Sequence, residues 1–133
     1  MAAPLSWAYA LLVLYASLFP FSGWRWPPGH KLLDLLALPW PPWVDPFDVW
    51  ANLSGYLPWG WLLLLALRPR LGSASTAWAC AVILPALVSY LVEVTQPFLP
   101  NRHPSLKDLA MNTLGAAFGA TLFLHEIPLR AHH

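Results

Sequence analysis

The sequence contains two copies of one polar pattern, whose residue types can form ion pairs with a cation and hydrogen bonds with a polar group. The first is Asp48-x-x-x-Asn52 and the second is Asp108-x-x-x-Asn112, and a glycine follows each asparagine three positions later. A spacing of four residues puts the carboxylate and the carboxamide on one face of a helix. They form a candidate binding site. The simpler interpretation is that both aspartates are helix N-caps and both asparagines bond neighbouring helices.

A third set of polar residues lies between the two copies. Glu93 and Gln96 share one side of a predicted helix with Ser89 or Tyr90. Glu93 stands near the C-terminal end of that helix, where the helix dipole disfavours a negative charge, so it needs a cationic partner or a proton. Arg102 is the nearest cation along the chain, and we expect it to pair with Glu93 or with one of the aspartates.

Composition indicates that these residues are positioned by membrane helices. Of 133 residues, 58% are hydrophobic, 14% aromatic and 10% charged, which is far from the balance of a soluble domain. Apolar runs of the length needed to cross a bilayer predict an all-α protein in which two duplicated helical hairpins form one membrane domain over residues 1–133. The four predicted helices cover approximately residues 4–21, 47–67, 76–96 and 106–125.

Several classes of partner are disfavoured. The net charge is +1 and no basic stripe suggests nucleic acid. No metal is expected, since neither an H-x-x-x-H nor a C-x-x-C spacing occurs, and no cofactor is expected. Cys80 is the one cysteine, and it lies inside an apolar run.

The predicted orientation rests on one short connection. Arg68 and Arg70 lie in a compact turn without an acidic residue, which is typical of the cytoplasmic side. Both termini are therefore predicted to be cytoplasmic, and the polar patterns to face outward.

The connection Ser22–Pro46 is rich in tryptophan and proline. Its segment His30–Leu38 would form a short, leucine-covered helix lying flat at the membrane interface. Anchoring is the simpler role for this connection, and a lid over a lipid headgroup or substrate is the alternative.

Small residues predict where helices approach closely. Gly115 and Gly119 form a small-x-x-x-small stripe, which we expect to serve a crossing within the chain, with homodimerisation as the alternative. Pro58 and Pro85 fall inside predicted helices and should bend them, which would widen one half of the bundle into a shallow cup.

These motifs resemble the VanZ-like family of small bacterial membrane proteins, named after an accessory teicoplanin-resistance protein. The resemblance consists of E-x-x-Q ending a helix, an arginine in the loop and D-x-x-x-N-x-x-G opening the next helix, with a similar upstream block. It covers the chain from end to end and implies a four-span protein of the bacterial inner membrane, but no established catalytic mechanism. The matching positions are Asp48, Asn52, Gly55, Glu93, Gln96, Arg102, Asp108, Asn112 and Gly115.

Three functions remain open. The favoured one is a non-enzymatic envelope protein that binds a membrane lipid, lipid-linked precursor or other amphiphile at its outer face. Glycopeptide resistance belongs to the context of one family member. Arg102 and the polar patterns would hold that ligand. A membrane enzyme acting on a lipid headgroup or cell-wall precursor would use Glu93 or Asp108 as general base, although no nucleophile set is recognisable. A small transporter would require a homo-oligomer, since four helices rarely enclose a pathway alone.

Overall fold

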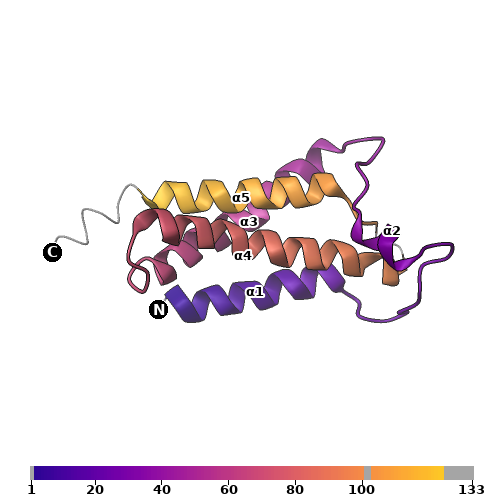
Figure 1. The fold of residues 1–133 in the computed structure, drawn as a ribbon, viewed down its shortest axis with the longest axis horizontal. Helices are drawn as coiled ribbons and strands as arrows, with labels where there is room; N and C mark the ends of the chain where they lie inside the picture. Colours follow the sequence, from indigo (N-terminus) through magenta and orange to yellow (C-terminus); the bar gives the residue numbers. More distant parts are fainter. Residues whose placement is uncertain (1, 101–102, 125–133) are drawn as a thin grey trace.

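All regular secondary structure is helical in the part of the chain that the computed structural model describes, residues 2–100 and 103–124. Four long helices lie side by side, and no strand occurs within those residues (Figure 1). Helix α1 begins at the same end of the bundle at which α5 ends; the opposite end, called the α2 end below, carries the long connection and α2. The elements are α1 (Ala2–Leu18), α2 (Leu32–Leu36), α3 (Pro46–Leu67), α4 (Ala74–Thr95), a 3-10 turn η1 (Gln96–Phe98) and α5 (Leu106–Leu124).

Each long helix lies on one of the four expected segments, with ends within three residues of those expected. The largest difference is at α1, which ends at Leu18 instead of continuing to Phe21. A residue that precedes proline is disfavoured in helical conformation, so Phe19, which precedes Pro20, lies beyond the helix.

The helix caps differ from the expectation that Asp48 and Asp108 are N-caps. The N-cap of α3 is Asp45, whose carboxylate accepts a hydrogen bond from the Phe47 N–H at 2.9 Å. At the start of α5 the Ser105 hydroxyl accepts from the Asp108 N–H at 3.2 Å. Each aspartate therefore lies in the first turn of its helix, where a carboxylate suits the dipole, and its side chain is available for other contacts.

Helices α3 and α5 cross closely because glycines remove the side chains between them. A Cβ added at Gly115 would clash with the backbone of Leu53, and one added at Gly119 would lie 2.9 Å from the Trp61 nitrogen. Gly60 on α3 is equally close to the backbone of Ala116 on α5. The predicted use of the small-residue stripe within the chain is therefore confirmed; its use between two copies stays a prediction.

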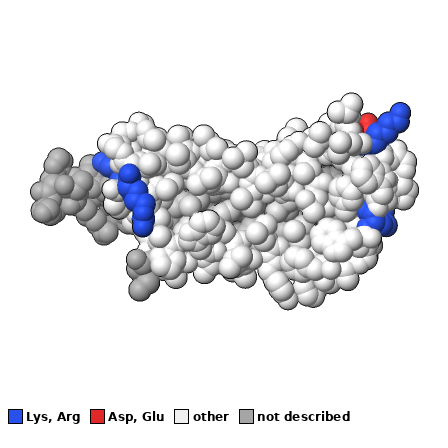
Figure 2. All heavy atoms as spheres, turned by 60° about the horizontal axis from the view of Figure 1, so that its bottom comes forward, with Lys and Arg blue, Asp and Glu red and all other residues white. Residues whose placement is uncertain are grey.

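Apolar residues also cover the outside of the bundle. Trp7, Leu33 and Leu122 are 75%, 79% and 63% exposed. In Figure 2 the visible lysines and arginines gather at the two ends, and the broad band between them has no charged residue. Such a surface is suited to a hydrocarbon environment.

Length and composition single out one helical stretch, Ala74–Phe98, as able to cross a membrane, while α1 is a shorter apolar helix. Helices α3 and α5 carry the charged and amide residues of the two polar patterns, and α3 also contains Pro58 and three tryptophans.

The connection between α1 and α3 is attached to the α2 end by hydrogen bonds from distant segments. The Tyr90 hydroxyl donates to the Leu36 carbonyl at 2.6 Å, and the Leu106 N–H donates to the Pro39 carbonyl at 2.8 Å. A helix does form in the segment expected to contain one, although it is limited to five residues, of which Leu35 is buried. The connection is thus held over the bundle end that carries the polar patterns.

Candidate functional site

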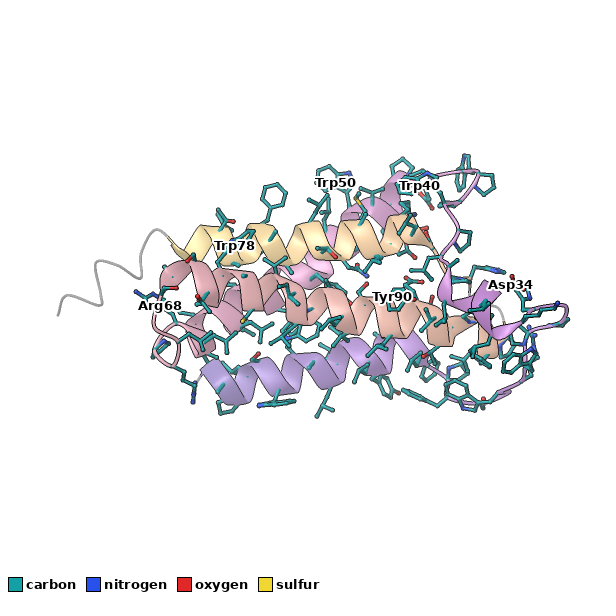
Figure 3. The ribbon with its side chains drawn as sticks, in the orientation of Figure 1. Asp34, Trp40, Trp50, Arg68, Trp78 and Tyr90 are labelled. Atoms are coloured by element: carbon teal, nitrogen blue, oxygen red, sulfur yellow. The ribbon has the colours of Figure 1, made fainter. Side chains whose placement is uncertain are left out.

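Polar side chains from three helices meet inside the half of the bundle nearer the α2 end. Figure 3 labels Tyr90 on α4 in this half, beside the connection, and Arg68 at the far end. The convergence expected from the two patterns is therefore observed for most of their residues. We call the following residues the polar cluster: Asp48, Asn52 and Tyr56 from α3, Ser89 and Glu93 from α4, and Ser105, Lys107, Asp108 and Asn112 at and within α5.

The two sequence copies bond each other directly. The Asn52 amide nitrogen, from the first copy, donates to an Asp108 carboxylate oxygen in the second at 3.0 Å. Lys107 joins the same two helices, since its ammonium nitrogen lies 3.4 Å from Asp108 and 3.9 Å from Asp48. Lys107 is only 5% exposed, whereas the Asp48 side chain is 57% exposed. The ion pairs of Lys107 therefore connect the interior of the bundle with its surface.

Glu93 is the most buried carboxyl group of the polar cluster, at 3% exposure. One of its oxygens accepts a hydrogen bond from the Ser105 N–H at 3.1 Å. Its carboxyl group also interacts electrostatically with the neighbouring Asp108 and Lys107. Two carboxyl groups and one ammonium are thus gathered where little water reaches, an arrangement that proteins use for binding polar groups and for acid–base chemistry.

Two buried groups beside these charges have unused hydrogen-bonding capacity. Asn112 donates to the Ser89 hydroxyl at 2.9 Å, but the Asn112 carbonyl oxygen has no hydrogen-bond partner among the described residues. The Tyr56 hydroxyl faces Ser89 and Glu93 without a hydrogen bond of normal geometry. Both residues are 6% exposed. Buried polar atoms of this kind are uncommon, because each costs about 1–3 kcal/mol when left unpaired.

Of the other residues predicted for the site, Gln96 lies apart from the cluster. The Gln96 amide donates to the Ser17 carbonyl at 3.2 Å and so links the end of α4 to the end of α1. Arg102 lies outside the described residues, and its pairing with Glu93 stays a prediction. The glycines of the patterns have backbone roles, since the Gly55 carbonyl accepts from the Tyr9 hydroxyl and Gly115 lies at the helix crossing.

Lys107 is the main residue that the sequence analysis did not place in the site. A lysine next to an aspartate at a helix start is commonly solvated, and here it is buried instead. The available signal was the repeat itself: the position equivalent to Lys107 in the first copy is Phe47, so only the second copy carries a cation there. Ser105 was also missed, because its contribution comes partly through its backbone N–H.

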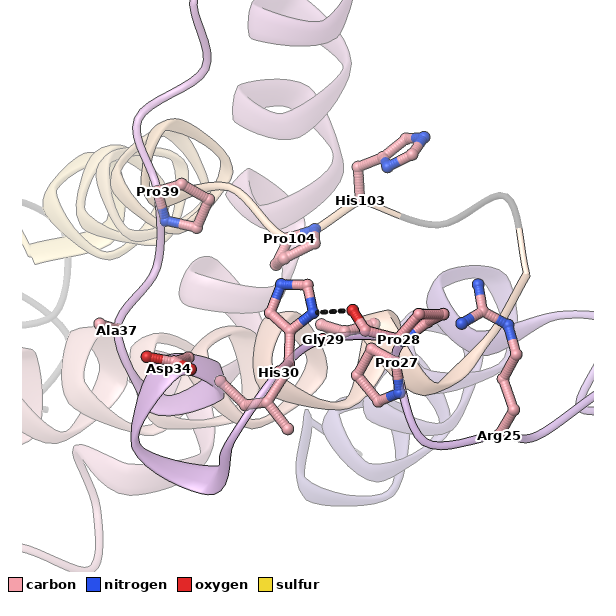
Figure 4. Close-up of a pocket in the computed structure, with 12 residues that line it drawn as sticks. Arg25, Pro27, Pro28, Gly29, His30, Asp34, Ala37, Pro39, His103 and Pro104 are labelled. Atoms are coloured by element: carbon pink, nitrogen blue, oxygen red, sulfur yellow. Dashed lines mark hydrogen bonds between the residues drawn. The ribbon is translucent and has the colours of Figure 1, made fainter.

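A separate pocket lies at the α2 end, between the connection and the segment that leads into α5 (Figure 4). Its volume is about 640 Å³, and its polar lining residues are Arg25, His30, Asp34 and His103. From the sequence, a lid over a lipid headgroup or substrate remained as the alternative role of the connection, but this pocket was not predicted. Within residues 2–100 and 103–124, no three His, Cys, Asp or Glu side chains come together as metal ligands.

Comparison with known families identifies a match. A family model described as VanZ/LLP1 matches residues 6–127, which is nearly the whole chain. Comparisons with curated proteins and with solved structures found no match.

Proposed function

The chain belongs to the VanZ/LLP1 family, as its motifs predicted, and from this premise we propose that it binds the polar head of a lipid-linked or amphiphilic molecule in the bacterial cell envelope. The observation that carries the proposal is the polar cluster, in which Glu93, Lys107 and Asn112 are buried at one end of a bundle with an apolar surface. Charged and amide groups inside a membrane are costly, so they are generally paired or functional. Here they are paired, yet hydrogen-bonding capacity remains at Tyr56 and Asn112.

The proposal places all four long helices across the inner membrane. At 1.5 Å per residue, the 17 residues of α1 extend about 26 Å and the 22 residues of α4 about 33 Å, close to a hydrocarbon core of about 30 Å. The α3–α4 connection with Arg68 and Arg70 would face the cytoplasm together with both termini. The α2 end and the polar cluster would then face the outer leaflet.

The ligand chemistry follows from the groups that the cluster offers. Carboxyl oxygens of Glu93 and Asp108 can accept hydrogen bonds, while the Lys107 ammonium and the unpaired Tyr56 hydroxyl can donate them. This mixture suits a head that carries hydroxyl, amide or amine groups next to an anion. An apolar chain attached to such a head would extend along the exposed leucines of the bundle.

A membrane enzyme is the second candidate, and one contact favours it. Glu93 and Asp108 are neighbours, and a pair of carboxyl groups whose environments differ is a common acid–base arrangement. Conversion of the retained lipid by the purified protein, lost when Glu93→Gln is introduced, would favour the enzyme over the binding protein. A transporter would in addition require an oligomer of defined size in detergent.

Retained lipids test the proposal. The wild type, Asn112→Leu and Thr113→Val are purified in a mild detergent, and their bound lipids are identified by native mass spectrometry. Thr113→Val is the matched control, because Thr113 is the next residue on α5 and its hydroxyl bonds only the backbone carbonyl of Leu109. We expect one lipid class to be enriched on the wild type and the control and lost from Asn112→Leu.

Stability separates a binding role from a structural one. Thermal unfolding of the three proteins is measured under the same conditions. If Asn112→Leu folds normally and still retains the same lipid class, or if the wild type retains only a random sample of membrane lipid, the proposed function is wrong.

A link to glycopeptide resistance is proposed from the family alone. It predicts a rise in teicoplanin tolerance when the chain is expressed in a sensitive Gram-positive host. Unchanged susceptibility with confirmed expression would remove that link without affecting the lipid-binding proposal.

A further inference from the structure

The pocket at the α2 end has the chemistry of an anion site. We propose that it binds the phosphate of an anionic amphiphile, so that the ligand of the polar cluster is a phospholipid or a lipid-linked phosphate. This inference rests on the proposed function and adds the chemical class of the ligand. Its basis is a cavity of about 640 Å³ whose lining includes Arg25, His30 and His103, which come from two distant segments and stand on different sides of the cavity (Figure 4).

The lining is suited to negative charge. Arg25 makes no ion pair within the described residues, and a guanidinium has a planar set of donors that matches a phosphate. His103 adds its imidazole nitrogens, and His30 adds its Nε2, because the His30 Nδ1 already hydrogen-bonds the Pro28 carbonyl at 2.8 Å. Asp34 is the single carboxylate there, and one of its oxygens already accepts from the Lys31 N–H at 3.0 Å.

The rest of the lining is mostly proline, at positions 27, 28, 39, 97 and 104. Proline rings are apolar and carry no N–H donor, so this part of the wall cannot hydrogen-bond a phosphate and instead offers contact to the first carbons of an attached chain. The phosphate contacts would therefore come from Arg25 and the two histidines. Hydrogen bonds keep the two sides of the pocket together, since the Arg25 N–H donates to the Phe98 carbonyl at 2.8 Å.

The pocket and the polar cluster share one short segment. Pro104 lines the pocket, and the next residue, Ser105, donates its N–H to Glu93 and accepts from the Asp108 N–H. The segment that lines the pocket is thus continuous in the chain with the start of α5, which carries part of the polar cluster. The proposal takes the two features as the outer and inner parts of one site.

Three probes separate the sources of the anion: dioctanoyl phosphatidic acid, dioctanoylglycerol, which lacks the phosphate, and inorganic phosphate. Their binding to the purified full chain is titrated by native mass spectrometry for the wild type, Arg25→Gln and Lys31→Gln. Lys31 is the matched control, because it is an exposed cation of the same connection that does not line the pocket. A charge-assisted hydrogen bond is worth at least a factor of about ten in affinity.

We expect the wild type to prefer phosphatidic acid over dioctanoylglycerol by about tenfold or more. Arg25→Gln should abolish most of that preference, and Lys31→Gln should change it by less than about twofold. His103→Gln supplies a second variant, for which we expect a smaller loss than for Arg25→Gln, because glutamine keeps a hydrogen-bond donor at this position. Normal thermal unfolding of the variants shows that a loss is not misfolding.

The inference is overturned by equal binding of phosphatidic acid to the wild type and Arg25→Gln. It is also overturned if inorganic phosphate displaces the lipid at similar concentration, because the free anion would then be the ligand. The proposed function survives either result as long as the lipid retained from the cell still depends on Asn112. If the wild type retains no specific lipid and shows no preference for phosphatidic acid, both proposals fail.

Discussion

Gly119→Ala tests the close crossing of α3 and α5, on which the geometry of the polar cluster depends. The added Cβ would lie 2.9 Å from both the Leu57 carbonyl carbon and the Trp61 nitrogen, and still closer to the Leu57 carbonyl oxygen. These are backbone atoms of α3, so no side chain can rotate away. The two helices must move apart to accept the methyl group.

The expected cost follows from two opposing terms. Forcing a methyl group into a packed contact costs about 1–3 kcal/mol, and contact with three backbone atoms puts this site near the upper end. Replacing glycine by alanine in a helix returns up to about 1 kcal/mol of propensity. Gly119→Ala should therefore lower the free energy of unfolding by about 1–2 kcal/mol.

Gly55→Ala is the matched control for this experiment. Gly55 also lies within a long helix, but a Cβ there would have no atom within 4 Å, so this variant should be neutral or stabilised by up to about 1 kcal/mol. Unfolding in mixed micelles with increasing dodecyl sulfate, followed by tryptophan fluorescence, measures both variants. Equal stability of Gly119→Ala and Gly55→Ala would refute the close crossing.

Two further predictions concern the charges and the connection. Lys107→Met removes the cation that contacts Asp48 and Asp108, and we expect about 2 kcal/mol of destabilisation in the same unfolding assay. This is below the full cost of breaking a buried ion pair, because Asp48 is largely exposed. The exposed control Lys31→Met should change stability by less than about 0.5 kcal/mol, and a similar loss in both variants would contradict the burial of Lys107. Tyr90→Phe removes the hydrogen bond to the connection, so the amide hydrogen exchange of residues 30–40 should accelerate. The free energy of unfolding of the bundle should fall by no more than about 1 kcal/mol. Unchanged exchange would show that this bond does not hold the connection.

Much of the fold follows from the lengths of the apolar segments and from the polar residues and prolines that end them. The caps illustrate the limit of that reasoning. Asp45 and Asp48 are both acceptable near a helix start, and the distinguishing signal was Pro46, which favours the first helical position and so puts the cap at Asp45. The meeting of Asn52 with Asp108 was predictable, because the second and fourth long segments run in the same direction and begin at the same depth.

The position of Lys107 could not be derived in the same way. Successive residues on a helix differ by about 100°, so facing Asp108 towards α3 leaves the direction of its neighbour undetermined until α5 is packed. Gln96 illustrates a related limit. It keeps helical φ and ψ at the C-cap of α4, and its amide bonds the Ser17 carbonyl at the end of α1, a neighbour that the periodicity of α4 alone does not identify. The pocket depends on hydrogen bonds between segments far apart in sequence, which periodicity does not report.

The bond between the two sequence copies also has a consequence for biosynthesis. Asn52 and Asp108 are 56 positions apart, so at roughly 5–20 residues per second the ribosome reaches Asp108 about 3–11 s after Asn52. During that interval the amide of Asn52 has no partner from the second copy, and the pocket lacks the wall that Pro104 supplies. We therefore expect α3 to keep its polar end at the water boundary or against the insertion machinery until α5 emerges. A chain released before that point would expose this polar end to lipid.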